Sequence, residues 1–153
     1  MTSESVPGPA MVRLPARSTV KGPETRFTGD VWVDGITVGA EAGQARLATV
    51  RFAPGARTAW HRHAHGQTLH VTEGHGVAGT KDGRSILMRP GDTVYTPPGV
   101  WHWHGALPSS FMTHLALADT GPDPDATDVD WADLVSDTDY DTATAAAAQE
   151  STK

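Results

Sequence analysis

Residues 55–74 read GARTAWHRHAHGQTLHVTEG and place His61, His63 and Gln67 close together along the chain. On a β-strand, residues i and i+2 face the same side of the sheet. The imidazoles of His61 and His63 can therefore reach one ion. Gln67 follows a short turn and begins the next run of strand-forming residues, so an antiparallel partner strand would bring its amide oxygen beside both rings.

A second segment, residues 91–106, reads GDTVYTPPGVWHWHGA. The Pro97-Pro98-Gly99 triplet predicts a tight turn that leads His102 into another strand. His102 adds a third imidazole, and His104 lies on the same strand face. All eight histidines of the chain fall between positions 61 and 114. We predict that His61, His63, Gln67 and His102 bind a divalent metal ion; the alternative is that these are exposed or structural strand histidines.

Around these segments, the chain alternates short apolar runs with turn signals. Runs rich in Val, Thr, Trp and Ile are separated by pairs and triplets that contain Gly, Pro and Asp. The signals are Asp34-Gly35, Pro54-Gly55, Asp82-Gly83, Pro90-Gly91-Asp92 and Pro97-Pro98-Gly99. Many short strands with such punctuation predict an all-β sandwich or barrel, here over residues 25–118.

The flanking regions differ in composition from this β-rich body. Residues 1–24 are rich in Pro, Ser and Gly and predict a flexible N-terminal arm. Residues 119–140 predict a linker followed by a short helix, with Val129, Trp131 and Leu134 at roughly helical spacing and Asp128 as its N-cap. Residues 141–153 are Ala-rich and polar; they either extend the helix or fray, and of the two we expect a flexible tail.

The amino-acid composition limits the kinds of protein that this chain can be. A chain of 153 residues suits one domain, and the absence of cysteine excludes disulfides and thiolate sites. No apolar stretch has the length of a membrane span or a signal peptide, so we expect a cytoplasmic protein. Residues 1–118 hold eleven Lys/Arg and eight Asp/Glu (+3), whereas residues 119–153 hold one Lys and ten Asp/Glu (−9). This acidic end does not favour nucleic acid or an anionic membrane as a partner.

Both quoted segments resemble the two sequence motifs of the cupins. The first motif, G-x5-H-x-H-x3/4-E-x6-G, is met from Gly55 to Gly74, with Gln67 in place of Glu. The second, G-x5-P-x-G-x2-H-x3-N, is met from Gly91 to Ala106, with Ala in place of Asn. The resemblance implies a small jelly-roll (double-stranded β-helix) barrel with the metal inside, to which we add the short C-terminal helix.

A closer resemblance covers roughly residues 25–140 and is to small bacterial manganese cupins that act as hydroxynitrile lyases. Many members of this subgroup are labelled only as carboxymuconolactone-decarboxylase-associated cupins. The subgroup shares the change from Glu to Gln, so the resemblance implies that Gln67 is itself a metal ligand. Its catalytic histidines correspond to His104 and His114. Ala118 stands where a hydroxynitrile lyase carries Gln, which removes a polar group from the expected pocket.

The donor set indicates what the metal could do. Three neutral imidazoles and a neutral amide leave a divalent ion its full charge, so it should be a stronger Lewis acid than an ion that also binds a carboxylate. The ligand types alone allow Mn, Fe, Co, Ni or Zn. With one ion per chain, the resemblance favours Mn²⁺, and Fe²⁺ is the alternative.

Small and apolar residues on the ligand-facing side of neighbouring strands predict a substrate pocket, although barrel core explains them equally well. They are Ala48, Val50, Phe52, Leu69, Met112, Ala116 and Ala118. His65, His70 and His75 are expected to be structural or exposed. Trp60, Trp101 and Trp103 are out of phase with the ligands and are expected to pack between the sheets or at a dimer surface. For Arg57, a surface position is favoured over contact with an anionic substrate.

Three functions remain open from the sequence. The leading one is a metal-dependent lyase of a small hydroxy or carbonyl compound, most concretely the cleavage of a cyanohydrin to an aldehyde and HCN. The second is a metal-dependent dioxygenase of a small aromatic or diketone substrate. The third is a non-catalytic cupin that binds a small ligand. The family resemblance also leads us to expect a homodimer or homotetramer.

Overall fold

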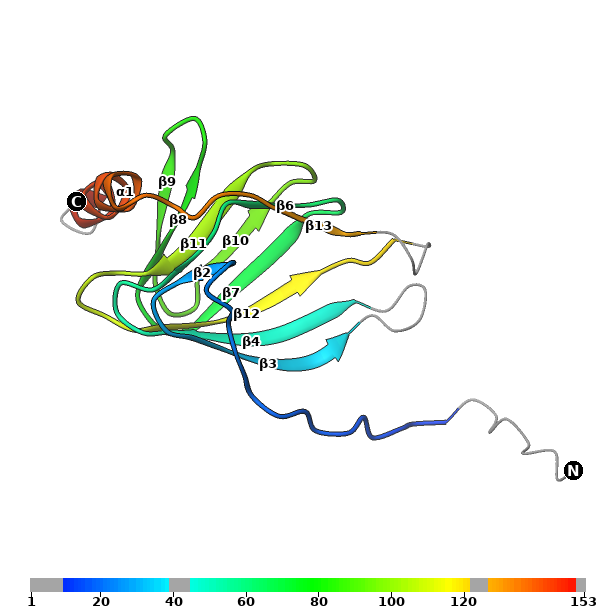
Figure 1. Cartoon of the computed structure of the whole chain (residues 1–153). Helices are drawn as coiled ribbons and strands as arrows, with labels where there is room; N and C mark the ends of the chain where they lie inside the picture. Colours follow the sequence, from blue (N-terminus) through cyan, green and yellow to red (C-terminus); the bar gives the residue numbers. More distant parts are fainter. Residues whose placement is uncertain (1–9, 39–44, 122–126, 151–153) are drawn as a thin grey trace, which may run out of the picture.

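The computed structural model describes residues 10–38, 45–121 and 127–150. Two antiparallel sheets curl toward each other and enclose a barrel-like interior, and one helix lies outside it (Figure 1). This confirms the prediction of a small all-β jelly-roll barrel with a short C-terminal helix. The strands are β1 (Val20–Lys21), β2 (Phe27–Thr28), β3 (Val31–Val38), β4 (Arg46–Phe52), β5 (Arg57–Thr58), β6 (His61–His63), β7 (Gln67–Gly74), β8 (Gly76–Thr80), β9 (Ser85–Met88), β10 (Thr93–Thr96), β11 (His102–Ala106), β12 (Met112–Ala118) and β13 (Val129–Trp131), and the helix is α1 (Asp137–Glu150).

One sheet has the strand order β1-β3-β4-β12-β7-β10. The other has the order β13-β6-β11-β5-β2, with β8 paired to both β11 and β9. We call the first of these sheet A and the second sheet B. Within the residues that the structure describes, no helix is both long and apolar enough to cross a bilayer.

Two glycines shape the turns that deliver the predicted ligands. Gly66 has φ of 82° in the turn between β6 and β7, and Gly99 has φ of 76° in the turn before β11. Side chains other than glycine rarely adopt this left-handed conformation. A Cβ on Gly66 would also lie 3.0 Å from the carbonyl oxygen of Thr96. These turns therefore depend on glycine at both positions.

The two faces of sheet B are buried against different partners. The inner face packs on sheet A around a core that includes Val31, Phe52 and Met88. The outer face packs on α1, where Trp60 and Trp103 meet Tyr140 in a second cluster. The tryptophans were expected to pack between the sheets or at a dimer surface; Trp60 and Trp103 lie instead under the helix.

The C-terminal region differs from the predicted helix over residues 129–135. Val129–Trp131 is strand β13, in which Val129 opposes His63 and Trp131 opposes His61 on β6. The β-branched and aromatic side chains suit a strand, and this pairing outweighs the roughly helical spacing. The helix begins instead at Asp137 and continues through residues 141–150, which were expected to be flexible.

The Ala-rich composition and a local cap explain the true position of the helix. Ser136 Oγ accepts a hydrogen bond from the backbone N of Asp139 at 3.1 Å, which satisfies one free amide of the first turn. Alanine has the highest helix propensity, and Tyr140, Thr144 and Ala147 face sheet B and are buried. At the other end of the chain, Val20–Lys21 of the predicted arm pairs with β3, while residues 1–9 and 151–153 lie outside the described residues.

Arg57 was expected at the surface, but its side chain is only 6% exposed. It lies between sheet B and α1, where Nη2 donates to the carbonyl oxygen of Val135 at 2.9 Å and to Asp137 Oδ1 at 2.7 Å. Its guanidinium also lies 4.4 Å from the centre of the Tyr140 ring. The expectation was wrong because the helix that covers Arg57 was predicted in a different place.

We predict that Arg57→Ala lowers the free energy of unfolding by about 2 kcal/mol, since it removes a charged hydrogen bond and a cation–π contact from a buried position. Urea unfolding followed by circular dichroism measures this. Arg89→Ala is the control, because the Arg89–Asp92 pair is exposed and should change the value by less than about 0.5 kcal/mol. Equal effects of both changes would contradict the role of Arg57 in holding α1.

Candidate metal centre

The four predicted ligands come from three strands that meet inside the barrel. β6 and β11 are paired, with His61 directly opposite His102. The ring centres are 4.3 Å apart for His61 and His102, 5.2 Å for His61 and His63, and 5.6 Å for His63 and His102. Gln67 begins β7 in sheet A, and its side chain reaches across to the imidazoles. All four residues are buried.

Backbone contacts fix which ring nitrogen carries the proton in two of these histidines. His61 Nδ1 lies 2.9 Å from the carbonyl oxygen of Ala59, and His102 Nδ1 lies 2.9 Å from that of Val100. A carbonyl oxygen only accepts, so Nδ1 is the donor in each ring. In the neutral imidazole, Nε2 then keeps its lone pair, which is the tautomer that a metal ligand needs.

The contact between His102 and Gln67 is the sharpest test of whether this site fits a cation. His102 Nε2 lies 3.0 Å from Gln67 Oε1. With the proton on Nδ1, both of these atoms are acceptors, and neither can donate to the other. Two ligands at right angles on an ion about 2.1 Å from each would be separated by about 3 Å. A cation between the two lone pairs therefore accounts for their close approach.

His63 provides a second test of the fit. Among the described residues, both of its ring nitrogens are buried without a hydrogen-bond partner, and His104 Nε2 is in the same condition. Ring nitrogens of His61, His102 and His104 also lie within 4.8 Å of one another. Buried polar atoms without partners are costly, and a metal ion bound to His63 would satisfy one of its two ring nitrogens. The residues present thus fit a divalent ion.

The surroundings keep these imidazoles uncharged. Burial lowers the pKa of His61 well below its usual value, and the nearby ring of His102 lowers it further. Burial likewise lowers the pKa of His63 to about 4, and it lowers the pKa of His102. The nearby Gln67 side chain acts against the lowering of the pKa in both His61 and His63, which is consistent with an amide beside both rings. Neutral imidazoles at pH 7 are available for coordination without first losing a proton.

His104 and His114, the predicted catalytic pair, are in direct contact. His114 Nε2 lies 3.0 Å from His104 Nδ1, so the two rings share one proton between them. Burial lowers the pKa of His104 well below its usual value, helped by the adjacent His114, and burial lowers the pKa of His114 to about 4. Phe52 packs against both rings, with centres 5.9 and 5.3 Å away. This pair can accept a proton at the unpartnered Nε2 of His104, beside the predicted metal ligands.

Two further residues shape the site and were missed in the sequence. Trp131 stacks on His61, with ring centres 4.7 Å apart and planes inclined by 24°. Thr58 Oγ1 accepts a hydrogen bond from the backbone N of His104 at 3.2 Å and lies 3.5 Å from His61 Nδ1. An alternating interpretation of Val129, Asp130 and Trp131 could have found Trp131; no sequence signal marks Thr58.

The predicted pocket residues share the inner face of sheet A. Ala48, Ala116 and Leu69 oppose one another across three strands, and Val50 opposes His114 in the next row. Val50, Phe52, Leu69 and Met112 are buried members of the core, and Ala48 and Ala116 pack against it. Ala118 is half-buried at the end of β12, opposite Arg46. Of these positions, Phe52 contacts His104 and His114, and all except Ala118 belong to the barrel core or pack against it.

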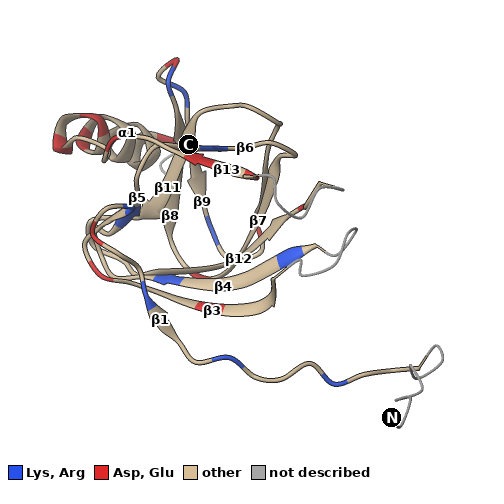
Figure 2. Cartoon of the chain, turned by 45° about the vertical axis from the view of Figure 1, so that its right-hand side comes forward, with Lys and Arg blue, Asp and Glu red and all other residues tan. Residues whose placement is uncertain are grey.

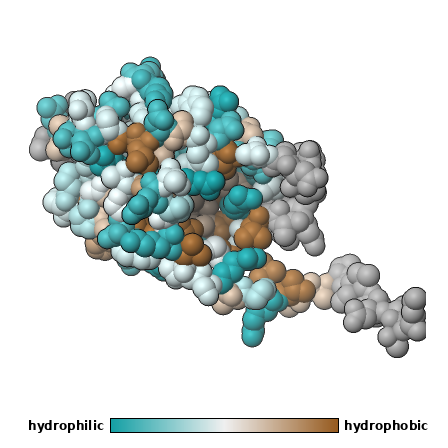
Figure 3. All heavy atoms as spheres, in the orientation of Figure 1, coloured by the Kyte–Doolittle hydropathy of each residue, from teal (hydrophilic) through white to brown (hydrophobic). Residues whose placement is uncertain are grey.

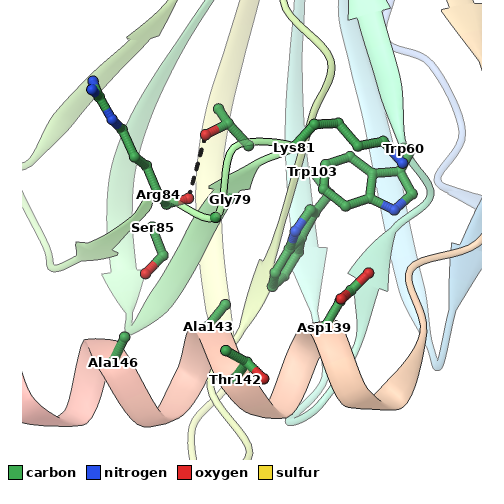
Figure 4. Close-up of a pocket in the computed structure, with 12 residues that line it drawn as sticks. Trp60, Gly79, Lys81, Arg84, Ser85, Trp103, Asp139, Thr142, Ala143 and Ala146 are labelled. Carbon is green, nitrogen blue, oxygen red and sulfur yellow. Dashed lines mark hydrogen bonds between the residues drawn. The ribbon is translucent and has the colours of Figure 1, made fainter.

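The remaining histidines lie outside this group. His70 and His75 are exposed, with His70 Nδ1 lying 2.9 Å from Thr93 Oγ1, and His65 lies 3.7 Å from an Asp128 carboxylate oxygen. A cavity of about 160 Å³ lies away from the predicted ligands, between α1 and the β8–β9 hairpin (Figure 4). Its walls include Trp60 and Trp103, and Lys81 lies 3.8 Å from the Trp60 ring centre. None of the predicted ligands contributes to that cavity.

Comparisons with known proteins agree with this geometry. Residues 48–113 match the family model described as Cupin domain. The chain is similar to an (R)-mandelonitrile lyase from Granulicella tundricola, with 43% identity over 128 residues that cover 84% of this chain and 95% of that protein. It is also similar to the crystal structure of a cupin-like protein from Thermotoga maritima, with a TM-score of 0.74 and 35% identity over 81% of this chain and 92% of that one. A shorter similarity, 40% over 52 residues, is to a gentisate 1,2-dioxygenase from a Ralstonia species and covers 34% of this chain and 15% of that protein.

We predict that Trp131→Ala weakens the binding of Mn²⁺ by about tenfold, because the stacked indole holds the ring of His61 in place. Isothermal titration calorimetry measures the affinity. Trp131→Phe should retain most of it, since a smaller ring can still stack. Trp101→Ala is the matched control, because Trp101 packs on Arg62 and not on a predicted ligand. An unchanged affinity in Trp131→Ala would contradict this role.

The metal-free protein should lose stability as the pH falls. The pKa of His114 is about 4 in the folded chain, against 6.5 for a free imidazole. Above pH 6.5, His114 is neutral in both the folded and the unfolded chain, so its protonation does not change the free energy of unfolding. Between pH 6.5 and 4, His114 takes up a proton in the unfolded chain but stays neutral in the folded one. His114 alone should therefore lower the free energy of unfolding by up to about 3 kcal/mol between pH 6.5 and 4.

Urea unfolding of the metal-free protein at a series of pH values measures this slope. His114→Gln should show a shallower fall than the wild type, whatever its stability at pH 7. His70→Gln is the control and should keep the wild-type slope, because His70 is exposed. Identical slopes in all three proteins would contradict the neutral burial of His114.

Proposed function

The chain belongs to the cupin family, and on that premise we propose that it is a metal-dependent lyase of a small hydroxy or carbonyl compound. The observation that carries the proposal is the contact between His104 and His114 next to two of the predicted ligands, His61 and His102, whose ring nitrogens lie within 4.8 Å of one of His104. A histidine base that can share its positive charge with a second histidine, once it is protonated, lies next to a predicted cation site. The similarity to a mandelonitrile lyase over most of both chains supports the same reaction class.

A divalent ion held by His61, His63, Gln67 and His102 would supply Lewis-acid polarisation of a substrate oxygen. We propose Mn²⁺ as this ion, with Fe²⁺ as the alternative. The protein supplies the proton transfer. With Nδ1–H of His104 donating to His114 Nε2, the Nε2 of His104 has a free lone pair and acts as the base. The resulting positive charge is shared with His114 through the 3.0 Å contact.

In its most concrete form, the reaction is the cleavage of a cyanohydrin. His104 Nε2 takes the hydroxyl proton, the bond between the carbinol carbon and the nitrile carbon breaks, and its electron pair leaves with cyanide. Cyanide then takes up the proton, so that an aldehyde and HCN are released and the imidazole pair is neutral again. Burial of His104 favours its neutral form and makes it ready to accept a proton at neutral pH.

We predict that the manganese-loaded protein releases benzaldehyde from mandelonitrile, measured by its ultraviolet absorbance. His104→Gln and His114→Gln should each lower kcat by about 100-fold, the usual contribution of general acid–base catalysis. Both variants should still bind one Mn²⁺, because neither residue is among the proposed ligands. His70→Gln should have wild-type activity.

Release of benzaldehyde no faster than with the metal-free protein would contradict the cyanohydrin reaction. Oxygen uptake with gentisate or another small aromatic substrate, in the absence of any lyase activity, would favour the dioxygenase alternative instead.

A further inference from the structure

A second cavity lies on the side of the barrel where the N-terminal segment passes between the two sheets. Its volume is about 430 Å³, and its walls include Val33 from sheet A and Phe27 and Trp131 from sheet B. Hydrophobic side chains are surrounded by hydrophilic ones on the face of the molecule in Figure 3. The cavity thus combines an apolar floor with a polar rim.

In both sheets, residues that line this cavity contact or neighbour residues of the candidate metal centre. On the sheet B side, Trp131 lines the cavity and also stacks on His61. On the sheet A side, Val33 pairs with Val50, and Val50 pairs with His114, so the three form one row on neighbouring strands. Trp131 alone therefore stands between the cavity and His61, whereas Val33 and Val50 stand between the cavity and His114.

The charge of the cavity has one sign. Three cationic residues line it, Arg17, Lys21 and Arg26, and no acidic residue does. Lys21 pairs with Asp30 at 3.1 Å, but neither Arg17 nor Arg26 has a carboxylate partner within the part of the chain that the structure describes. Figure 2 shows basic residues along the N-terminal segment, and acidic residues on α1, on β13 and also on β3.

The two unpaired guanidinium groups are held at the cavity by packing. Arg26 Cζ lies 5.1 Å from the centre of the Trp131 ring, which orients the guanidinium by a cation–π contact. The side chain of Arg17 lies over Gly35 of β3, where its Cδ would be 3.3 Å from an added Cβ. Arginine binds oxyanions through paired N–H groups, and the apolar floor suits a ring or short hydrocarbon.

We infer that this cavity binds the anionic end of the substrate, which is a small apolar or aromatic molecule bearing an oxyanion. The oxyanion is a carboxylate or a phosphate, held by Arg17 and Arg26, with its apolar part on Phe27 and Trp131. This assignment rests on the proposed function in one respect, namely that the molecule bound there is the substrate of the metal centre. A neutral cyanohydrin would leave both guanidinium groups unused.

The test compares three molecules that differ only in the group opposite a hydroxymethyl arm. They are 4-(hydroxymethyl)benzoate, 4-(hydroxymethyl)phenyl phosphate and the neutral 4-(hydroxymethyl)benzamide. Calorimetric titration of the metal-free and the manganese-loaded protein should show at least one of the anions binding about tenfold tighter than the amide, in both states, at low ionic strength. The tighter of the two anions identifies the oxyanion. Raising the salt concentration should reduce the preference.

The double variant Arg17→Gln/Arg26→Gln should bind the preferred anion and the amide with equal affinity. Arg13→Gln is the matched control, since Arg13 is exposed in the same N-terminal segment and does not line the cavity. Arg26→Lys should retain part of the preference. Thermal melting of each variant checks that the fold is intact, so that a loss of selectivity reports the site and not unfolding.

Equal affinity for all three molecules in the wild type, or a preference that survives the double substitution, would overturn the inference. So would an equal loss in Arg13→Gln. The outcome is separable from that of the proposed function. A protein that prefers the anion but releases no benzaldehyde from mandelonitrile contradicts the cyanohydrin reaction alone, whereas a working lyase with no preference for the anion contradicts only this site.

Discussion

The structure depends on keeping several imidazoles uncharged inside a barrel that gives them too few hydrogen-bond partners. Burying a polar group without a partner costs several kcal/mol, on the order of a large part of a small domain's stability. His63 and His104 carry buried ring nitrogens without a partner among the described residues, and His102 faces the acceptor oxygen of Gln67. A cation bound by His63, His102 and Gln67 would turn the costs at these residues into favourable contacts, while His104 Nε2 stays free as the proposed base, so metal binding would contribute to the stability of the fold.

The rest of the molecule holds these side chains in place. The glycine turns at Gly66 and Gly99 deliver Gln67 and His102 from opposite sheets. β13 adds an edge strand whose Trp131 packs flat on His61. On its outer face, sheet B is supported by α1 through a cluster of aromatic residues and a buried arginine. Rigid support of this kind is what a preorganised site requires.

Local patterns in the sequence predicted the strands and the ligand segments because their physical causes are local. Two histidines at i and i+2 share a strand face whatever surrounds them, and Pro-Pro-Gly forms a turn by its own conformational limits. The contacts of Trp131 and Arg57 depend on partners many residues away, so no local pattern specified them. The start of α1 does have a local cause, the cap at Ser136. The short segment at Val129 fits either a helix or a strand, and pairing with β6 decided between them.

Anomalous diffraction from a crystal of the protein loaded with Mn²⁺ tests the central claim most directly. The account predicts one strong peak per chain at the manganese edge, within about 2.3 Å of ring nitrogens of His61, His63 and His102 and of the Gln67 amide oxygen. A peak bound by His61, His102 and His104 but distant from His63 and Gln67 would contradict the ligand set. The absence of any peak in the barrel after loading would contradict the metal centre itself.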